Sequence, residues 1–443
     1  MINTSTRPGR PRLSAGLALF CAFSFAPASA PAQDLTFTPF HSNGIYQLGE
    51  RAGWNVALAR GAAPPAGAYT YIIRKDNCDV IAAGSLDLSS GSATIETALG
   101  EPAMLYVEVA AHTSPSAPTA GPQPPSIHLG AAIAPSLLEP SVPRPADFDA
   151  FWDSNLKALG AIPIDPVLAP AETGKPGVEL YTVKLSSLRS HVQGYLAKPA
   201  REGKFPALVI FQYAGVYALQ PDTVTDLAAE GWLAFDVDSH DLAPSQATGV
   251  SPQYQAIGNS DRETSYFLNM YLRDSRAIDY IASRPDWDGK NIVAMGTSMG
   301  GQQSLAAAGL NPKITAVIVN EPAGADSNAD LHGRQAGYPN WPSGNPKVME
   351  TALYFDTVNF ASRIKAPVLA AMGFIDTIAP PAGIWIAIDQ IPGAKEAVPM
   401  VESDHNNITP DKQGNFHARA QEVLAQILHG GEFKPDEKLT RKK

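Results

Sequence analysis

The chain is poor in cysteine, with only Cys21 and Cys78 in 443 residues. A disulfide framework is therefore excluded, and stability must come from hydrophobic cores, for which a hydrophobic content of 44% is sufficient. Cys78 is interpreted as a packing residue. Long apolar runs are lacking as well: no stretch of about 18 apolar residues follows the N-terminal segment, so we expect no transmembrane segment.

Positive charge and metal ligands are also scarce. The formal net charge is −10, and an acidic chain is repelled by phosphate backbones, which argues against nucleic acid as a partner. The nine histidines are spread along the sequence, and no pair of histidines or cysteines has the spacing of metal ligands. We therefore expect neither a metal nor an organic cofactor.

Residues 1–32 are typical of a cleaved signal peptide, which predicts export to the periplasm or the medium. A basic start precedes a short apolar stretch, and small residues then place the cleavage before Gln33. A short membrane anchor is the alternative, whereas Phe20 before Cys21 argues against a lipoprotein. The three features are Arg7, Arg10 and Arg12, then Leu13–Phe25, then Ala30–Ala32.

Between residues 34 and 129, short segments rich in aromatic and β-branched residues alternate with clusters of Gly, Pro, Asn and Ser. This spacing predicts a small N-terminal β-sandwich domain of the immunoglobulin-like type. The segment Thr113–Ser126, rich in Pro and Ser, is interpreted as an extended linker. The clearest strands are Trp54–Leu58, Tyr69–Arg74 and Met104–Val109.

Residues 143–432 follow a different pattern, in which apolar strand-like runs alternate with helix-like segments. The pattern predicts an α/β domain with a mostly parallel, doubly wound sheet that is covered on both faces. The expected strands are Ala207–Phe211, Trp232–Val237, Asn291–Met295, Ile314–Val319, Pro367–Met372 and Ala397–Val401, and the expected helices are Thr223–Glu230, Thr264–Ser283, Gly300–Gly309, Ala382–Gln390 and Asn415–His429.

Three further segments of this domain have a predicted role. Asp147–Leu159 has one apolar stripe at helical spacing, so its Trp152 is interpreted as a packing residue, with carbohydrate stacking as the alternative. Leu242–Asn259 and Asn328–Glu350 are rich in Pro, Gly and Asn and show little periodicity. We expect these two segments to be insertions that shape a substrate site.

The strongest chemical signal is the sequence Gly-Thr-Ser-Met-Gly at Gly296–Gly300. It follows the strand Asn291–Met295 and precedes a helix of small residues, which is the context of a nucleophile elbow in an α/β-hydrolase fold. The glycines permit a sharp turn, and the amides at the start of the helix would stabilise negative charge near Ser298. Ser298 is therefore the predicted catalytic nucleophile.

A serine needs a base, and in this fold the chain order is serine, acid, histidine. His405 lies just past the last predicted strand and is the favoured base; Asp376 ends the preceding strand segment and is the favoured acid. Helix capping is the alternative role for Asp376. The rivals are His332, His417 and His429 for the base, and Asp326 and Asp404 for the acid.

An oxyanion intermediate would need two backbone donors. One is expected to be the N–H group of Met299, which directly follows the nucleophile. The other should come from the loop after the strand Ala207–Phe211, where Tyr213 is favoured and Ala214 is the close alternative.

These residues resemble the acetyl xylan esterase and cephalosporin-C deacetylase family, carbohydrate esterase family 7, over about Pro143–His429. The resemblance rests on the segment Arg144–Trp152, on Ser298 in its elbow, on Gly373–Asp376 and on His405. It implies an α/β-hydrolase with a Ser-His-Asp triad, and it implies an oxyanion hole made by the backbone of Tyr213 and Met299.

The sequence departs from this family at two places. Met299 stands where the family usually has glutamine, and Asp236–Asp241 stands where it usually has an Arg-Gly-Gln-Gly motif. The family typically forms hexamers, so the resemblance leaves a homo-oligomer open, although the added N-terminal strands could obstruct that assembly.

The expected function is that of a secreted serine esterase that removes acetyl groups from carbohydrate esters. The expected partner is an acetylated saccharide or another small ester. Other short-chain carboxylesterases and acyl thioesterases share this machinery. A prolyl-oligopeptidase-like peptidase would need a β-propeller, for which the N-terminal region is too short. A glycan-binding module with a vestigial triad is the non-enzymatic alternative.

Overall fold

The computed structural model describes residues 35–59, 69–111 and 126–440. The predicted signal peptide lies outside these residues, as does nearly all of the predicted linker Thr113–Ser126. Residues Gln33–Lys443 group as one compact unit, so the domain boundary expected within it stays a prediction. Among the described residues, no helix combines the length and the apolar character needed to cross a bilayer.

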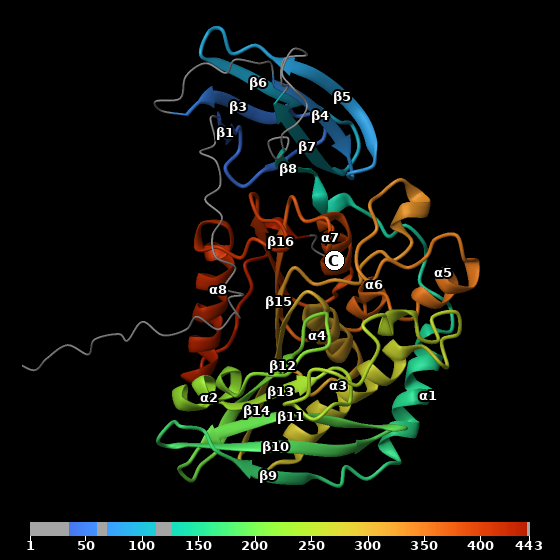
Figure 1. The fold of residues 1–443 in the computed structure, drawn as a ribbon, viewed down its shortest axis with the longest axis vertical. Helices are drawn as coiled ribbons and strands as arrows, with labels where there is room; N and C mark the ends of the chain where they lie inside the picture. The colour runs from blue at the N-terminus through green and yellow to red at the C-terminus, as the bar shows by residue number, and fades with distance from the viewer. Residues whose placement is uncertain (1–34, 60–68, 112–125, 441–443) are drawn as a thin grey trace, which may run out of the picture. The chain divides into compact units, whose positions relative to one another are not determined.

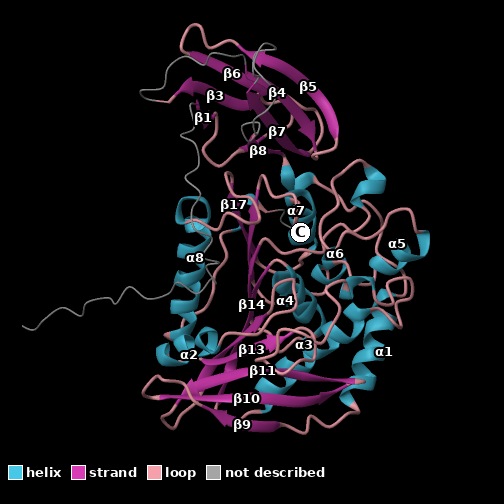
Figure 2. Cartoon of the chain, in the orientation of Figure 1, coloured by secondary structure: helices cyan, strands magenta, loops and turns pink. Residues whose placement is uncertain are grey.

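The N-terminal region consists of two β-sheets around a shared core, and Figure 2 shows no helix among its described residues. One sheet has the strand order β1-β3-β6 and the other β2-β8-β7-β4-β5, as expected for a sandwich. Buried Trp54, Ile73 and Val107 come from both sheets. The strands are β1 Leu35–Pro39, β2 Ile45–Tyr46, β3 Ala52–Leu58, β4 Tyr69–Lys75, β5 Asp79–Leu86, β6 Ser92–Thr97, β7 Ala103–Ala111 and β8 Ile127–Ile133.

Cys78 lies in the turn between β4 and β5, next to Asp76 and Asn77, both of which have positive φ angles. It is half-buried and lies outside the core cluster of these two sheets.

The remainder of the chain is built on a nine-stranded sheet with the order β17-β16-β15-β14-β12-β13-β11-β10-β9. The six strands from β17 to β13 are parallel, and three of them are buried at every position because helices cover both faces. All six correspond to predicted strands. They are β12 Phe205–Phe211, β13 Leu233–Asp238, β14 Trp287–Thr297, β15 Ala316–Asn320, β16 Val368–Gly373 and β17 Lys395–Met400.

Helices α2 and α8 lie on one side of this sheet, and α3, α4 and α7 lie on the other (Figure 1). Helix α1 packs against α3, and its Trp152 is fully buried and donates to the Tyr354 carbonyl, which confirms the packing interpretation. The helices are α1 Phe148–Gly160, α2 Pro221–Glu230, α3 Tyr266–Ser283, α4 Met299–Leu310, α5 Pro346–Ala352, α6 Thr357–Ala361, α7 Pro381–Gln390 and α8 Pro410–Leu428, with short 3-10 turns at Pro135–Leu137, Tyr254–Ala256, Ala329–His332 and Glu437–Leu439.

Three strands at one edge of the sheet were not expected from the sequence. They run antiparallel and are β9 Val167–Ala171, β10 Val178–Ser187 and β11 Ser190–Pro199. Strands β10 and β11 form a hairpin whose turn contains Arg189 in a left-handed conformation. Their alternating pattern lacks the continuous apolar run that marks the buried parallel strands.

The N-terminal strands contact loops of the α/β region. Gly130 in β8 lies so close to Phe374 that an added Cβ would be 2.5 Å from the Phe374 carbonyl oxygen. Elsewhere the Asn77 amide donates to Gln335 over 2.7 Å, and Arg334 lies 3.8 Å from the Asp76 carboxylate. The N-terminal strands therefore pack next to Asp376, two residues after Phe374.

Candidate active site

Ser298 stands at the turn from β14 into α4, with φ 56° and ψ −122°. A positive φ is strained for a residue with a Cβ, and such strain is typical of functional turns. Two flanking glycines make the turn sterically feasible: a Cβ on Gly296 would be 2.3 Å from the Gly300 backbone, and one on Gly300 would be 2.1 Å from the Phe211 carbonyl oxygen. The local sequence therefore folds as the expected elbow.

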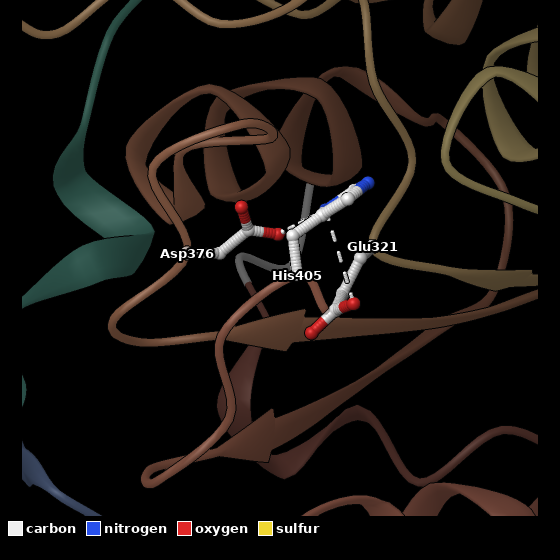
Figure 3. A group of neighbouring side chains, drawn as sticks. All are labelled: Glu321, Asp376 and His405. Atoms are coloured by element: carbon white, nitrogen blue, oxygen red, sulfur yellow. Dashed lines mark hydrogen bonds and ion pairs between the residues drawn. The ribbon is translucent and has the colours of Figure 1, made fainter. Parts of the chain in front are cut away.

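The side chains of Ser298, His405 and Asp376 meet although they lie far apart in the sequence. His405 Nε2 is 2.8 Å from Ser298 Oγ, and His405 Nδ1 is 2.7 Å from Asp376 Oδ2. Figure 3 shows Asp376 and His405 side by side with the carboxylate turned toward the ring. Because a carboxylate oxygen only accepts, Nδ1 carries the proton and Nε2 is left to accept from the serine hydroxyl.

Asp376 is held rigidly. Its second carboxylate oxygen, Oδ1, accepts hydrogen bonds from the backbone N–H groups of Ile378 and Ala379, both over 2.8 Å. The side chain is buried, so these donors replace water. Asp376 therefore makes capping contacts through one carboxylate oxygen and contacts His405 through the other.

Two effects act on the protonation of His405. Burial lowers its pKa, but the hydrogen bond from Nδ1 to Asp376 and the negative charge of Asp376 raise it more, so the pKa lies above its ordinary value. The ring is thus a stronger base than a free histidine.

The rival residues lie elsewhere. Asp404 accepts from the N–H groups of Asn406 and Asn407, and Asp326 accepts from Ser141 and pairs with Arg334. His332 belongs to the 3-10 turn Ala329–His332, His417 lies in α8, and His429 caps the end of α8. The ring that lies beside the Ser298 hydroxyl is that of His405, with Nε2 2.8 Å from Oγ.

The loop after β12, which contains the predicted oxyanion residue Tyr213, lies against the start of α4. The Gln303 side chain of α4 donates to the Gln212 carbonyl over 2.8 Å, and Gln212 Oε1 accepts from the Ser239 N–H over 3.0 Å. The ring of Tyr213 stacks on Tyr217, with centroids 4.5 Å apart. Tyr213 therefore sits on a fixed loop beside the helix that begins with Met299.

The segment Asp236–Asp241, where the family motif is missing, supports the same loop. The His240 ring lies 2.8 Å from the Gly215 carbonyl through Nε2 and 2.9 Å from the Tyr266 hydroxyl through Nδ1. Burial lowers the pKa of His240 to about 4, so the ring is neutral and donates from Nε2 to the carbonyl. Asp238 Oδ1 accepts from the N–H groups of His240 and Leu242.

The two predicted insertions meet at Met299. Tyr254 comes from the first insertion and Tyr338 from the second, and their hydroxyl groups are 2.8 Å apart. Each hydroxyl also lies 3.2 Å from Met299 Sδ, and Tyr254 accepts from the Gly215 N–H over 3.3 Å. Sequence reasoning missed both tyrosines, because aperiodic segments do not indicate which side chain points inward.

Glu321 was also missed. It directly follows β15, is fully buried and has its Oε2 atom 3.9 Å from His405 Nδ1 (Figure 3). Ligand atoms of Glu321, Asp376 and His405 lie within 4.8 Å of one another, a spacing that could suit a metal ion. However, Nδ1 donates its proton to Asp376, so it offers no lone pair to a metal in this arrangement.

Comparison with known proteins decides the family. The family model described as acetyl xylan esterase (AXE1) matches residues 138–328 and 338–420. The chain belongs to the acetyl xylan esterase family. It is also 30% identical over 385 residues to acetyl esterase Axe7A of Xylanibacter ruminicola, covering 83% of this chain and 85% of that protein.

Solved structures agree with this assignment. An acetyl xylan esterase from Paenibacillus sp. R4 has a TM-score of 0.58 at 25% identity, covering 66% of this chain and 98% of its own. Acetyl xylan esterase 1 from Thermoanaerobacterium sp. JW/SL YS485 has a TM-score of 0.56 at 22% identity, covering 66% and 97%, which shows the shared fold. This member of the acetyl xylan esterase family is thus an α/β-hydrolase that acts on carboxylic ester bonds.

Proposed function

We propose that the chain is an exported serine esterase that removes acetyl groups from carbohydrate esters, with Ser298 as nucleophile, His405 as base and Asp376 as the orienting acid. The observation that carries this proposal is the continuous hydrogen-bonded path from Ser298 through His405 to Asp376, with distances of 2.8 and 2.7 Å. Membership of the acetyl xylan esterase family supports the acetyl ester as substrate.

The first half of the proposed reaction acylates the serine. Ser298 Oγ attacks the ester carbonyl while His405 Nε2 accepts its proton, and Asp376 stabilises the imidazolium that forms. The N–H groups of Met299 and Tyr213 would stabilise the oxyanion, a role worth about 3 kcal/mol for one donor in a comparable site. The fixed loop around Gln212 and the start of α4 support this assignment.

Collapse of the first intermediate completes the acylation, and acetate is then released in the second half. His405 protonates the sugar alkoxide as it leaves, which yields the free alcohol and an acetyl–Ser298 ester. Water then gives a proton to His405 and attacks the acetyl carbonyl, and the collapse of this intermediate returns the proton to Ser298. All proton transfers pass through the His405 imidazole, so the reaction requires no further proton donor or acceptor.

Export is the second part of the proposal. It rests on the basic, apolar and small-residue pattern of residues 1–32 and agrees with the lack of a membrane-spanning helix among the described residues. Mass spectrometry of the protein from the periplasm or medium should find a mature chain that begins at Gln33. A mature chain that retains Arg7 would contradict cleavage.

Acetate release from acetylated xylo-oligosaccharide tests the activity, with wild type compared with Ser298→Ala. We expect release by the wild type and at least a 10³-fold loss in the variant, because the Ser298 hydroxyl is the nucleophile that His405 Nε2 contacts. A melting curve checks that the variant is folded. If neither protein releases acetate but wild type cleaves short-chain nitrophenyl esters, the carbohydrate substrate is wrong and the serine assignment stands.

A further inference from the structure

Glu321 is a buried carboxyl group without a lysine or arginine partner among the described residues. Its side chain is fully buried, and the ion pair that the described residues give it is with His405. Burying a carboxylate costs free energy unless it is paired or protonated. Burial and the nearby charge of Asp376 raise the pKa of Glu321 to about 8, so the group is mostly neutral at pH 7.

The site is built around this side chain. Ser403 Oγ lies 3.0 Å from Glu321 Oε1, and the Gln413 amide donates to Glu321 Oε2 over 3.2 Å and to Ser403 Oγ over 3.0 Å. A Cβ on Gly373 would come within 2.6 Å of Oε1, so a glycine makes room for the carboxyl group. Glu321 itself has φ 45°, a strained value for a residue with a Cβ.

These contacts attach Glu321 to the loop that carries the base. Ser403 precedes His405 by two residues. Its hydrogen bond to Glu321 therefore fixes the start of the loop that carries the catalytic histidine. Asp376 and Glu321 approach the same imidazole nitrogen from two strands, at 2.7 and 3.9 Å (Figure 3). A movement of about 1 Å would bring Glu321 Oε2 within hydrogen-bond range of Nδ1.

We propose that Glu321 is a second positioning residue for His405: it stays uncharged while Asp376 is ionised, and it ionises and holds the imidazole when the charge of Asp376 is removed. The electrostatic reason is that two carboxylates this close disfavour each other's ionisation. Loss of one charge therefore favours ionisation of the other. This inference rests on the proposed triad, because it assigns Glu321 a role through His405.

A double-mutant cycle tests the inference, with kcat/KM for a short-chain nitrophenyl acetate measured in wild type, Glu321→Gln, Asp376→Asn and the double variant. Glutamine can donate to Ser403 and accept from Gln413, so it keeps the hydrogen bonds and removes only the ionisable group. We expect Glu321→Gln alone to cost about 2–5-fold. Asp376→Asn should cost about 10²-fold, less than the ~10⁴-fold known for a triad without a second acid.

In the Asp376→Asn background, Glu321→Gln should lower kcat/KM by a factor at least ten times larger than the factor it causes in wild type. The matched control is Glu402→Gln in that background, because Glu402 lies in the same loop but is exposed; it should leave kcat/KM unchanged. Equal costs of Glu321→Gln in both backgrounds would overturn the inference. A failed triad would appear instead as activity that survives Ser298→Ala, measured alongside.

A pH profile separates an electrostatic role from a merely structural one. The carboxyl groups of Asp376, Glu321 and Asp404 each raise the pKa of His405 when they are ionised. The acidic limb of kcat/KM should therefore have a lower midpoint in the double variant than in Asp376→Asn, while Asp404 is unchanged in both. Identical midpoints would contradict the inference.

If Glu321→Gln does not fold, Glu321→Asp, with a shorter reach, should still lower the residual activity of Asp376→Asn; no reduction would overturn the inference.

Discussion

The N-terminal β-sheet region and the α/β region each contain a histidine paired with a carboxylate. In the N-terminal region, His41 Nε2 lies 3.1 Å from Glu50, and its Nδ1 lies 2.8 Å from the Ile45 carbonyl; the two side chains are 44% and 34% exposed. In the α/β region, the side chains of His405 and Asp376 are 12% and 0% exposed, and the second ring nitrogen faces a serine hydroxyl. The His405–Asp376 pair thus differs from the His41–Glu50 pair in two ways: it is buried, and its second ring nitrogen contacts the Ser298 hydroxyl.

The two kinds of sheet explain this difference. Strands of the N-terminal sheets have one face toward the core and one toward water, as in β5 and β6, so polar side chains spread over an outer surface. The central parallel strands are buried along their length, and the residues that follow them meet at one edge. Ser298, Glu321 and Asp376 follow β14, β15 and β16 and therefore converge.

The largest predicted difference between the regions concerns the two histidines. His405→Ala should lower kcat by about 10⁴-fold or more, because His405 Nε2 is the base that contacts the Ser298 hydroxyl. His41→Ala should leave kcat unchanged and lower the free energy of unfolding by less than about 1 kcal/mol, as for an exposed ion pair. Steady-state kinetics with a nitrophenyl ester checks both; a loss of less than tenfold in His405→Ala would break the comparison.

Glycine substitutions give the next largest contrast. Gly300→Ala would place a Cβ 2.1 Å from a backbone oxygen, so the elbow cannot close, and we expect a loss of about 3 kcal/mol in stability together with most of the activity. Gly100 in the N-terminal region has no heavy atom within 4 Å of a built Cβ, so Gly100→Ala should stay within about 0.5 kcal/mol. Denaturant unfolding measures both, and equal stabilities would refute the packing argument.

Gly130→Ala tests where the two regions touch. The new methyl group would press on the Phe374 backbone, two residues from Asp376, so we expect kcat to fall about tenfold with little change in KM. Gly91→Ala, in an N-terminal turn with open space around it, is the control and should change stability only, because its φ is 85°. Unaltered kinetics in Gly130→Ala would show that the N-terminal strands do not constrain the loop that carries Asp376.

The smallest predicted effect is on pH dependence. His405 must be neutral to accept the serine proton, and its pKa is raised above 6.5, so kcat/KM should fall as the pH drops through a midpoint above 6.5. His41→Ala should leave this midpoint in place. A midpoint below 6.5 in wild type would mean that burial outweighs the carboxylates around His405.

Much of this arrangement could be predicted from the sequence, because buried parallel strands have continuous apolar runs. The elbow at Ser298 and the positions of Asp376 and His405 follow from such strands and from what comes directly after them. The edge strands β9–β11 lack that signal and were missed. An alternating pattern around the Leu188-Arg189 turn would have indicated the β10–β11 hairpin.

Side-chain partners were harder to predict. Glu321 also follows a parallel strand, but its sequence position does not show that a left-handed backbone turns it toward His405. Tyr254 and Tyr338 lie in aperiodic insertions, where only the fold decides which ring reaches Met299. The Xylanibacter relative aligns with 83% of the chain, which is more than residues 138–443 can supply, so its similarity extends into the N-terminal strands.

The central claim is that Ser298 is the residue that becomes acylated. The most direct measurement is peptide mapping by mass spectrometry after labelling the folded protein with a fluorophosphonate, which reacts with activated serines. The account predicts one adduct, on the peptide that contains Ser298, and its loss in Ser298→Ala and His405→Ala. An adduct on another serine, or an unlabelled wild-type protein that still hydrolyses acetyl esters, would contradict the account.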